Sequence, residues 1–215
     1  RLGRRAEQSA ALDHALDIAR ACGDAARQAA ILLRRASAEV YLGHHAKALR
    51  AAEEAHATFA SIGDLPGQAE ALRELGFVHW HAQEYAAALQ RARDALALHR
   101  QMGDIVGEAT ALHNLAEIHR GLGSPRQAAE WFERAMQLHW AAGHREGEIL
   151  SLFGWAQALA QEGDAPGAQR KLEDALKLSE RHGERTMQAR ALHALAMHHA
   201  ALGQTEVALS SIRRA

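Results

Sequence analysis

The chain has 215 residues, with 25 Lys and Arg against 26 Asp and Glu, which gives a formal net charge of −1. Without a basic excess, a general nucleic-acid binder is disfavoured, because such proteins usually carry clustered positive charge. The single cysteine excludes an internal disulfide, and no apolar run approaches the roughly 18 residues that a transmembrane helix requires. We therefore expect a cytoplasmic protein whose partner is neither nucleic acid nor a membrane.

Glycine recurs along the chain at a fixed period of forty residues, at positions 23, 63, 103, 143 and 183. A leucine follows each of these glycines nine residues later. Such self-similarity indicates stacked repeats, because one unit of this length is too small to bury a core of its own.

The repeat boundaries follow from taking Gly23 as a first position. We expect the second half of an earlier repeat at 1–22, full repeats at 23–62, 63–102, 103–142 and 143–182, and a shortened repeat at 183–215. Because Arg1 falls in the middle of a repeat, we interpret 1–215 as a single array that belongs to a longer protein.

Each repeat holds two apolar stripes with helical spacing. In the repeat 103–142 the first stripe comprises Ala109, Leu112, Leu115, Ala116 and His119. The second comprises Ala128, Ala129, Phe132, Ala135, Met136 and His139. Steps of three and four residues put each set on one helix face. No alternation with a period of two supports strands, so the repeat is predicted to be helix, tight turn, helix, tight turn.

Short polar residues stand where these helices are expected to begin. Side-chain oxygens at such positions accept hydrogen bonds from the free backbone N–H groups of the first turn. The expected capping residues are Asp24, Asp64, Asp104, Ser124 and Asp164.

The pattern resembles the tetratricopeptide repeat, whose usual order is Leu-Gly, Tyr, Gly, Ala, an aromatic residue and Ala. The matching positions of the third repeat are Leu115, Ala116, His119, Gly123, Ala128, Phe132 and Ala135. The family's usual unit has about 34 residues, and the forty-residue variant occurs in cell-polarity adaptors and bacterial regulators. The resemblance covers the whole chain, although His79, His119 and His199 replace the usual Tyr. It implies an all-α fold, a right-handed α-solenoid of helix-turn-helix repeats with about eleven helices.

In this family a second stripe on each first helix lines the inner, concave wall, and by position it includes Leu33, Val40, Arg190, His193 and Met197. The partner-binding residues predicted on this wall are Tyr41, Arg73, Phe77, Trp80, His81, His113, Asn114, Glu117, Arg120, Phe153 and Gln157. Aromatic residues mixed with Arg are typical of binding hot spots. The alternative is ordinary packing between repeats, above all for Phe77 and Trp80.

The resemblance predicts a non-enzymatic scaffold or regulatory module that binds a peptide or protein on the concave face. The alternative is a sensory or self-associating segment of a bacterial multidomain regulator, with a homo-oligomer formed through the terminal helices. No catalytic residue, cofactor or metal is predicted. Although the chain has 15 histidines, no two are three or four residues apart, which is the spacing of a metal site on one helix.

Overall fold

The computed structural model describes residues 2–214, and the side chains of residues 11–213. Every regular element in this range is an α-helix, and there are eleven of them. Connections of two or three residues join consecutive helices. None of the described helices has the length and the apolar run that crossing a bilayer would require. The all-α fold class predicted from the repeat pattern is confirmed.

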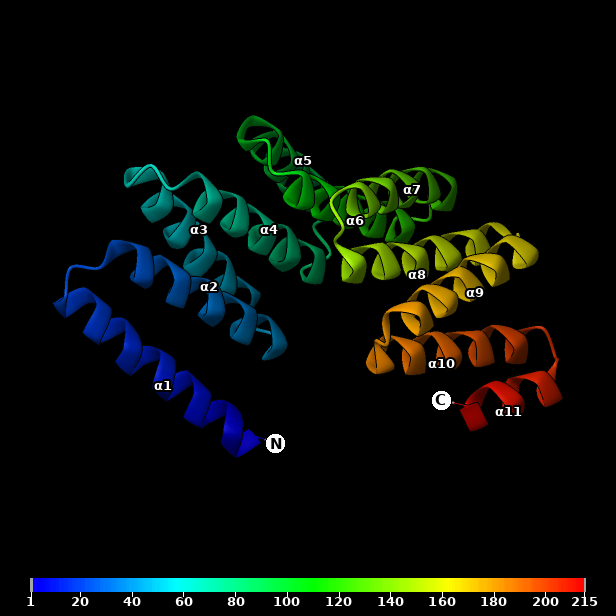
Figure 1. Ribbon diagram of the computed structural model, residues 1–215. Coiled ribbons are helices and arrows are strands. Elements are labelled where there is room, and N and C mark those ends of the chain that lie inside the picture. Colours follow the sequence, from blue (N-terminus) through cyan, green and yellow to red (C-terminus); the bar gives the residue numbers. More distant parts are fainter. Residues whose placement is uncertain (1, 215) are drawn as a thin grey trace. The chain divides into compact units, whose positions relative to one another are not determined.

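The first of two compact units covers residues 1–104. Its helices are α1 (Leu2–Ala21), α2 (Ala25–Tyr41), α3 (His45–Ser61), α4 (Leu65–His81) and α5 (Tyr85–Met102). Each helix packs against the next along the chain, and α2 also packs against α4 (Figure 1). The first helices of two consecutive repeats therefore lie side by side in this unit.

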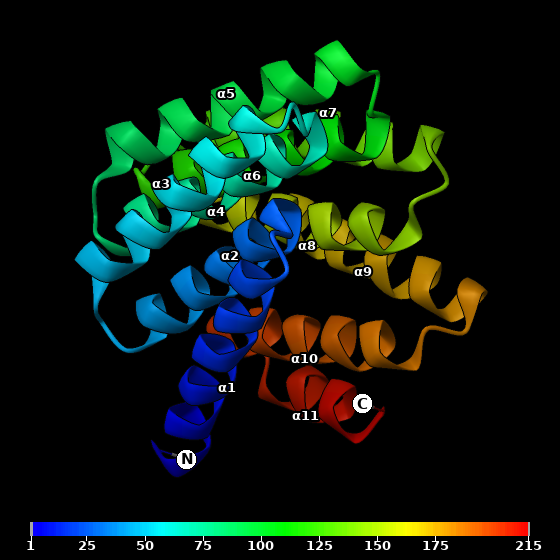
Figure 2. The same ribbon diagram turned by 90° about the vertical axis from the view of Figure 1, so that its left-hand side faces the viewer.

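The second unit covers residues 105–215. Its helices are α6 (Ile105–Gly121), α7 (Pro125–Ala141), α8 (Arg145–Glu162), α9 (Ala165–His182), α10 (Arg185–Ala201) and α11 (Thr205–Arg214). Consecutive helices again pack in pairs (Figure 2), and α8 contacts both α6 and α10. The division between the units falls two residues after the predicted boundary between the repeats 63–102 and 103–142. A single array over 1–215 stays a prediction.

The predicted apolar stripes form the core of each unit. In the second unit Leu112, Leu115 and Phe132 are at most 3% exposed, and in the first unit Leu32 and Leu72 are 4% exposed. Alanine fills the sites where helices cross most closely, because a methyl group lets two backbones approach. Ala48, Ala88, Ala128 and Ala168 have no exposed surface at all.

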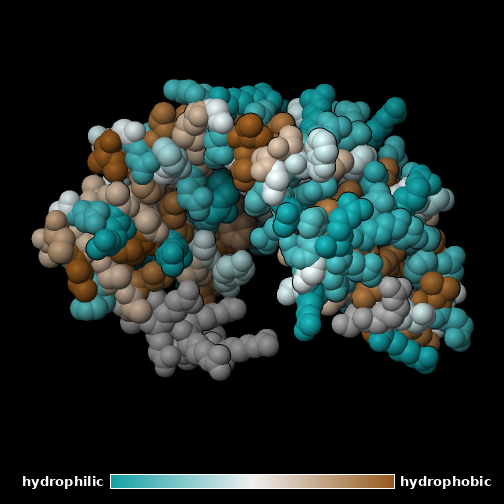
Figure 3. All heavy atoms as spheres, in the orientation of Figure 1, coloured by the Kyte–Doolittle hydropathy of each residue, from teal (hydrophilic) through white to brown (hydrophobic). Residues whose placement is uncertain are grey.

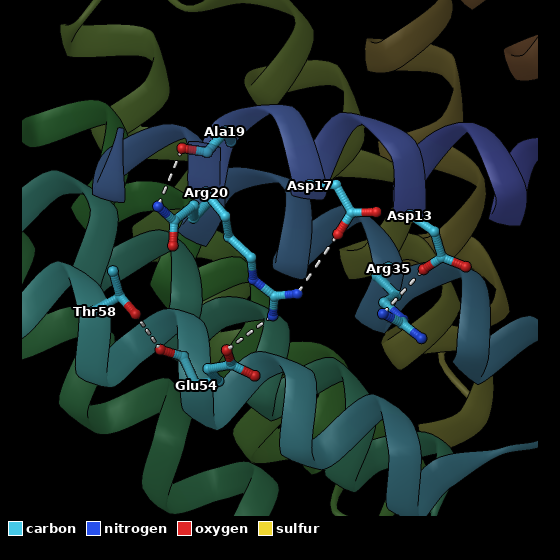
Figure 4. A network of polar contacts seen from close by, with 8 residues as sticks. Asp13, Asp17, Ala19, Arg20, Arg35, Glu54 and Thr58 are labelled. Carbon is cyan, nitrogen blue, oxygen red and sulfur yellow. Dashed lines mark hydrogen bonds and ion pairs between the residues drawn. The ribbon is translucent and has the colours of Figure 1, made fainter. Parts of the chain in front are cut away.

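Polar contacts and buried apolar side chains both attach α1 to the helices that follow. Arg35 Nη1 lies 3.1 Å from Asp13 Oδ1, and Arg20 Nη2 lies 3.8 Å from Glu54 Oε1 (Figure 4). Each of these largely exposed ion pairs contributes only about 0–1 kcal/mol. Burial of Leu16 therefore carries more of the attachment. Arg35 interrupts the apolar stripe of the first repeat, and the pair with Asp13 explains why it is tolerated.

Each of the ten connections contains one left-handed backbone position, which directly precedes the last residue of the connection, and nine of these positions are glycine. The nine are Gly23, Gly43, Gly63, Gly103, Gly123, Gly143, Gly163, Gly183 and Gly203. The tenth is Gln83, with a φ of 64°. Glycine adopts this conformation without steric cost, whereas a residue with a Cβ does not. The turns thus recur every twenty residues, at half the period of the sequence repeat.

Aspartate caps the helices as predicted at three of the expected positions. The backbone N–H donors lie 2.9 Å from the carboxylates: Arg27 for Asp24, Gly67 for Asp64 and Gly167 for Asp164. The prediction for Ser124 is wrong, since its side chain makes no capping hydrogen bond. Its hydroxyl has a shorter reach than a carboxylate, and its φ of −112° differs from the −80° to −84° of the aspartates.

Truncating a core leucine should open a cavity. Leu112→Ala is expected to lower the free energy of unfolding by about 2–5 kcal/mol, measured by urea denaturation. Leu122→Ala, at a site that is 41% exposed, should change it by less than about 0.5 kcal/mol. Equal losses at the two positions would contradict the assignment of Leu112 to the core.

Replacing the one non-glycine turn residue should stabilise the first unit. Gln83→Gly is expected to raise the free energy of unfolding by about 1 kcal/mol, because it relieves the left-handed strain of a residue with a Cβ. The reverse change at an equivalent turn, Gly103→Gln, should lower it by a similar amount. Thermal denaturation of both variants checks the sign, and a less stable Gln83→Gly protein would refute the account of this turn.

Candidate functional site

Three predicted binding residues meet on the face formed by α2 and α4. The ring centroids of Tyr41 and Phe77 are 6.1 Å apart, and those of Phe77 and His81 are 4.4 Å apart in an edge-on arrangement. Tyr41 is 64% exposed. We call Tyr41, Phe77 and His81 the α2–α4 aromatic row. Phe77 is half-buried against the core cluster of Val40, Ala48 and Val78, and the Tyr41 ring extends this row onto the exposed surface.

Arg73 lies on the same helix as this row, but carboxylates already engage it. Its Nη2 lies 2.8 Å from Glu70 Oε1 and 3.5 Å from Glu74 Oε2. Glu74 is buried and accepts a hydrogen bond of 2.5 Å from Ser37 Oγ. Burial raises the pKa of Glu74, while the Ser37 hydrogen bond and Arg73 act in the opposite direction. The charge of Arg73 is therefore largely balanced within its own unit.

Other predicted inner-wall residues take part in packing. Trp80 is half-buried and meets the ring of Tyr85, at the start of α5, with centroids 5.1 Å apart. Leu33 and Val40 are only 7% and 5% exposed. Their assignment to an open wall is wrong, because α2 packs against both α3 and α4 and buries these two side chains.

On α6 the predicted residues are again in contact with the rest of the fold. The ring of His113 lies edge-on to Phe132 of α7, at 5.1 Å between centroids, and its Nδ1 is 3.4 Å from Ser151 Oγ of α8. Burial lowers the pKa of His113. Arg120 Nη2 lies 2.7 Å from Glu117 Oε2. The remaining predicted residue of this helix, Asn114, is half-buried.

A groove of about 910 Å³ opens between α8 and α10 in the second unit. Its apolar lining consists of Phe153, Ala156, Ala160, Leu172, Ala189, Ala194, Met197 and Ala201. Its polar lining consists of Gln157, Thr186, Arg190, His193 and His198. Five of the thirteen lining residues are alanines, whose methyl groups are too small to fill the space between the two helices. We call it the α8–α10 groove.

Phe153 lies at the bottom of this groove, and Arg190 lies beside it. Phe153 is 8% exposed, and the guanidinium carbon of Arg190 lies 5.5 Å from its ring centroid. Met197 stands on the lining with 61% of its surface exposed. Burial lowers the pKa of His198. None of the lining residues is a carboxylate, so the groove is apolar with a positive edge.

Two of the predicted partner-binding residues lie in this groove, and their role in binding stays a prediction. Phe153 and Gln157, both predicted, line the groove together with Arg190, His193 and Met197 of the same expected stripe. The spacing of residues along the sequence did not predict the α8–α10 groove itself. A signal was present in the run of alanines at 156, 160, 189, 194 and 201, but alanines also mark close helix contacts in this chain.

Several histidines contact side chains across the connections between consecutive helices. His79 Nδ1 lies 2.7 Å from Glu84 Oε2, and His99 Nδ1 lies 2.9 Å from Asp104 Oδ2. Each contact joins the last turn of one helix to the residue that precedes the next. His79 therefore has a bonding partner at a position where the family usually has Tyr. Among the described residues, no group of three or more His, Cys, Asp or Glu is placed to hold a metal ion.

One turn brings two imidazoles together. His139 Nδ1 and His144 Nδ1 are 3.1 Å apart, and His139 is 2% exposed. Gly147 makes this contact feasible, because a Cβ there would come within 2.5 Å of both rings. Burial, then the neighbouring His144 and His113, lower the pKa of His139 to about 4.

The comparisons with known proteins agree with this geometry. Residues 67–139 match the family model described as tetratricopeptide repeat. BtubC (BKLC) from P. vanneervenii superposes with a TM-score of 0.82 at 17% identity, over 98% of this chain and 89% of that one. No curated protein matches the sequence.

Two further solved structures share the fold. A signal transduction ATPase with numerous domains and a tetratricopeptide repeat sensor, from Pyrococcus horikoshii, has a TM-score of 0.72 at 19% identity, over 89% of this chain and 30% of that one. A Rap protein complexed with competence and sporulation factor has a TM-score of 0.73 at 15% identity, over 99% of this chain and 70% of that one. At these identities the likenesses show the fold alone.

The helix pairs, their turns and the family match define an α-helical repeat protein. Residues 67–139 are recognised as tetratricopeptide repeats, and the helix pairs on either side of them repeat the same fold. Repeats of this family are generally non-enzymatic scaffolds for interactions between proteins.

Acid should destabilise the second unit through His139. A histidine whose pKa falls from its ordinary 6.5 to about 4 on folding favours the folded state while it is neutral. The contribution of His139 to the free energy of unfolding is complete above pH 6.5. It is lost as the pH falls toward 4, and the total loss is about 1–3 kcal/mol. Urea denaturation at pH 7 and at pH 5 measures this loss.

His139→Phe is the matched variant, because Phe59 occupies the equivalent position eighty residues earlier. It should lose less stability than the parent protein between the two pH values. An unchanged pH dependence would show that another group is responsible.

Proposed function

We propose that this protein is a non-enzymatic module that binds a peptide or a segment of another protein in the α8–α10 groove. The observation that carries the proposal is the groove itself, which holds about 910 Å³ between helices that are already in place. An apolar hollow with a few polar groups at its edge is the usual form of a ligand site. A groove between parallel first helices suits an extended or helical segment.

The rigidity of the helix pairs supports this function. Ala156 and Ala189 are held on helices whose other faces are buried in the second core, with Ile149 and Ala191 completely covered. A site that is ordered before binding loses little conformational entropy when its partner arrives. The Rap structure with competence and sporulation factor shares this fold. It supports, by analogy alone, a bound factor as the partner.

The α2–α4 aromatic row is proposed as a separate contact area in the first unit. Its exposed Tyr41 ring and the adjoining Phe77 and His81 rings have the composition of a binding surface. Arg73, Trp80, His113, Glu117 and Arg120 already contact other residues of the fold, and we do not assign them to either contact area.

A second candidate function is a sensory or self-associating segment of a larger regulator. The observation that favours it is α11, where Val207, Leu209 and Ile212 are between 42% and 55% exposed. Figure 3 shows hydrophobic atoms on the surface near α10 and α11. Light scattering across a concentration series tests this candidate, because self-association through α11 predicts a dimer that Ile212→Glu disrupts.

Filling the groove tests the leading proposal. Peptides are first selected from a displayed random library on the whole chain, and their affinity is measured by fluorescence anisotropy. Ala160→Phe adds a ring to the groove at an exposed position, and it should weaken binding about tenfold or more by occupying the site. Circular dichroism should show unchanged helicity.

The matched control is Ala200→Phe, which adds the same ring to an exposed site of α10 that does not line the groove. This variant should bind within about twofold of the parent protein. Similar losses in both variants, or a library that yields no binding peptide, would reject the groove as the binding site.

A further inference from the structure

We propose that Arg190 determines the specificity of the α8–α10 groove, and that the segment bound there carries a carboxylate beside a large apolar side chain. The inference rests on the proposed function, whose ligand it describes more closely. It follows from the surroundings of Arg190, which differ from those of the other two arginines predicted on the inner stripe.

Those two arginines have carboxylate partners on their own helices. Arg73 pairs with Glu70 at 2.8 Å, and Arg120 pairs with Glu117 at 2.7 Å. In both pairs the glutamate stands three residues before the arginine, which puts the two side chains on the same helix face. Their charges are compensated before any ligand arrives.

At Arg190 the equivalent partner is missing. Three residues earlier the chain has Met187, whose sulfur lies 3.9 Å from Arg190 Nη1. The guanidinium also lies over the ring of Phe153, with its carbon 5.5 Å from the ring centroid. No carboxylate among the described residues forms an ion pair with Arg190. The sulfur and the ring hold the guanidinium in place and leave its charge uncompensated.

The charge of the groove selects for an acidic ligand. Apart from Arg190, its polar lining residues are a glutamine, a threonine and two histidines, and none of them carries a negative charge. An entering carboxylate therefore meets no like charge, and it can accept two parallel hydrogen bonds from the planar guanidinium. A lysine at the same place would be repelled, and this contrast is what gives specificity.

The neighbouring surface selects for an apolar group beside that carboxylate. Phe153 forms the buried floor next to the guanidinium, and the exposed Met197 lines the same groove. Methionine side chains adapt to the shape of their partner. With Ala156 and Ala160 leaving room on α8, the hollow accepts a leucine or an aromatic ring close to the ion pair.

The test uses the peptides selected on the whole chain, each synthesised in three forms that differ at one acidic position: Glu, Gln and Lys. The Glu form should bind about tenfold or more tightly than the Gln form, as expected for a charge-assisted hydrogen bond, and the Lys form should be weakest. In Arg190→Gln the preference for Glu over Gln should disappear, and Arg190→Lys should restore only part of it.

Arg170→Gln is the control, because Arg170 is an exposed arginine on α9 that does not line the groove. It should leave the preference unchanged. If selected peptides bind in the groove without a preference for an acidic residue, or if the preference survives Arg190→Gln, the inference fails while the proposed function stands. If sodium dodecanoate binds the groove and no peptide does, both fail, and the ligand is a small amphiphile.

Discussion

The left-handed position that recurs every twenty residues is the constraint on which the rest of the structure depends. It ends the preceding helix after about five turns, and within each of the two units it lets the next helix pack back against that helix. Glycine supplies this conformation at nine of the ten connections. A shift of one residue at any turn would rotate the following helix by about 100° and carry its apolar stripe away from the core.

With the register set in this way, the size of the side chains decides how closely the helices pack. Fully buried alanines such as Ala128 and Ala168 bring first and second helices together. Alanine has the opposite effect between α8 and α10, where it lines a hollow on both sides. Because Phe153 and Leu172 hold the floor of that hollow, it remains open. The same residue type therefore tightens the core and opens the site.

The turns also explain the abundance of histidine. Contacts such as His79–Glu84 and His199–Gln204 bridge the end of one helix and the start of the next, at 2.7 Å each. The spacing of five residues is readable in the sequence once the turn is known. Before that, these histidines are unexplained, and a search for pairs three or four residues apart cannot find them.

The position of a residue in the family's repeat pattern predicted correctly which helix carries it, but it did not predict reliably whether its side chain is exposed. Phe153 and Gln157 line the groove as the stripe indicated. By contrast, Trp80 packs on Tyr85 and His113 lies against Phe132. The difference arises because a first-helix residue can lean toward the open face or toward a second helix, and spacing along one helix does not report which neighbour lies within reach.

The sequence by itself determined the class of fold, the helix pairs and their turns, because a forty-residue period and helical apolar spacing are local properties of the chain. It also placed most core residues, such as Leu112 and Phe132. Only the tertiary structure decided where the surface is hollow and which charged groups are already paired. Cavities and ion pairs depend on side chains from several helices at once, so the compensated Arg73 and the uncompensated Arg190 look alike until the fold brings their neighbours together.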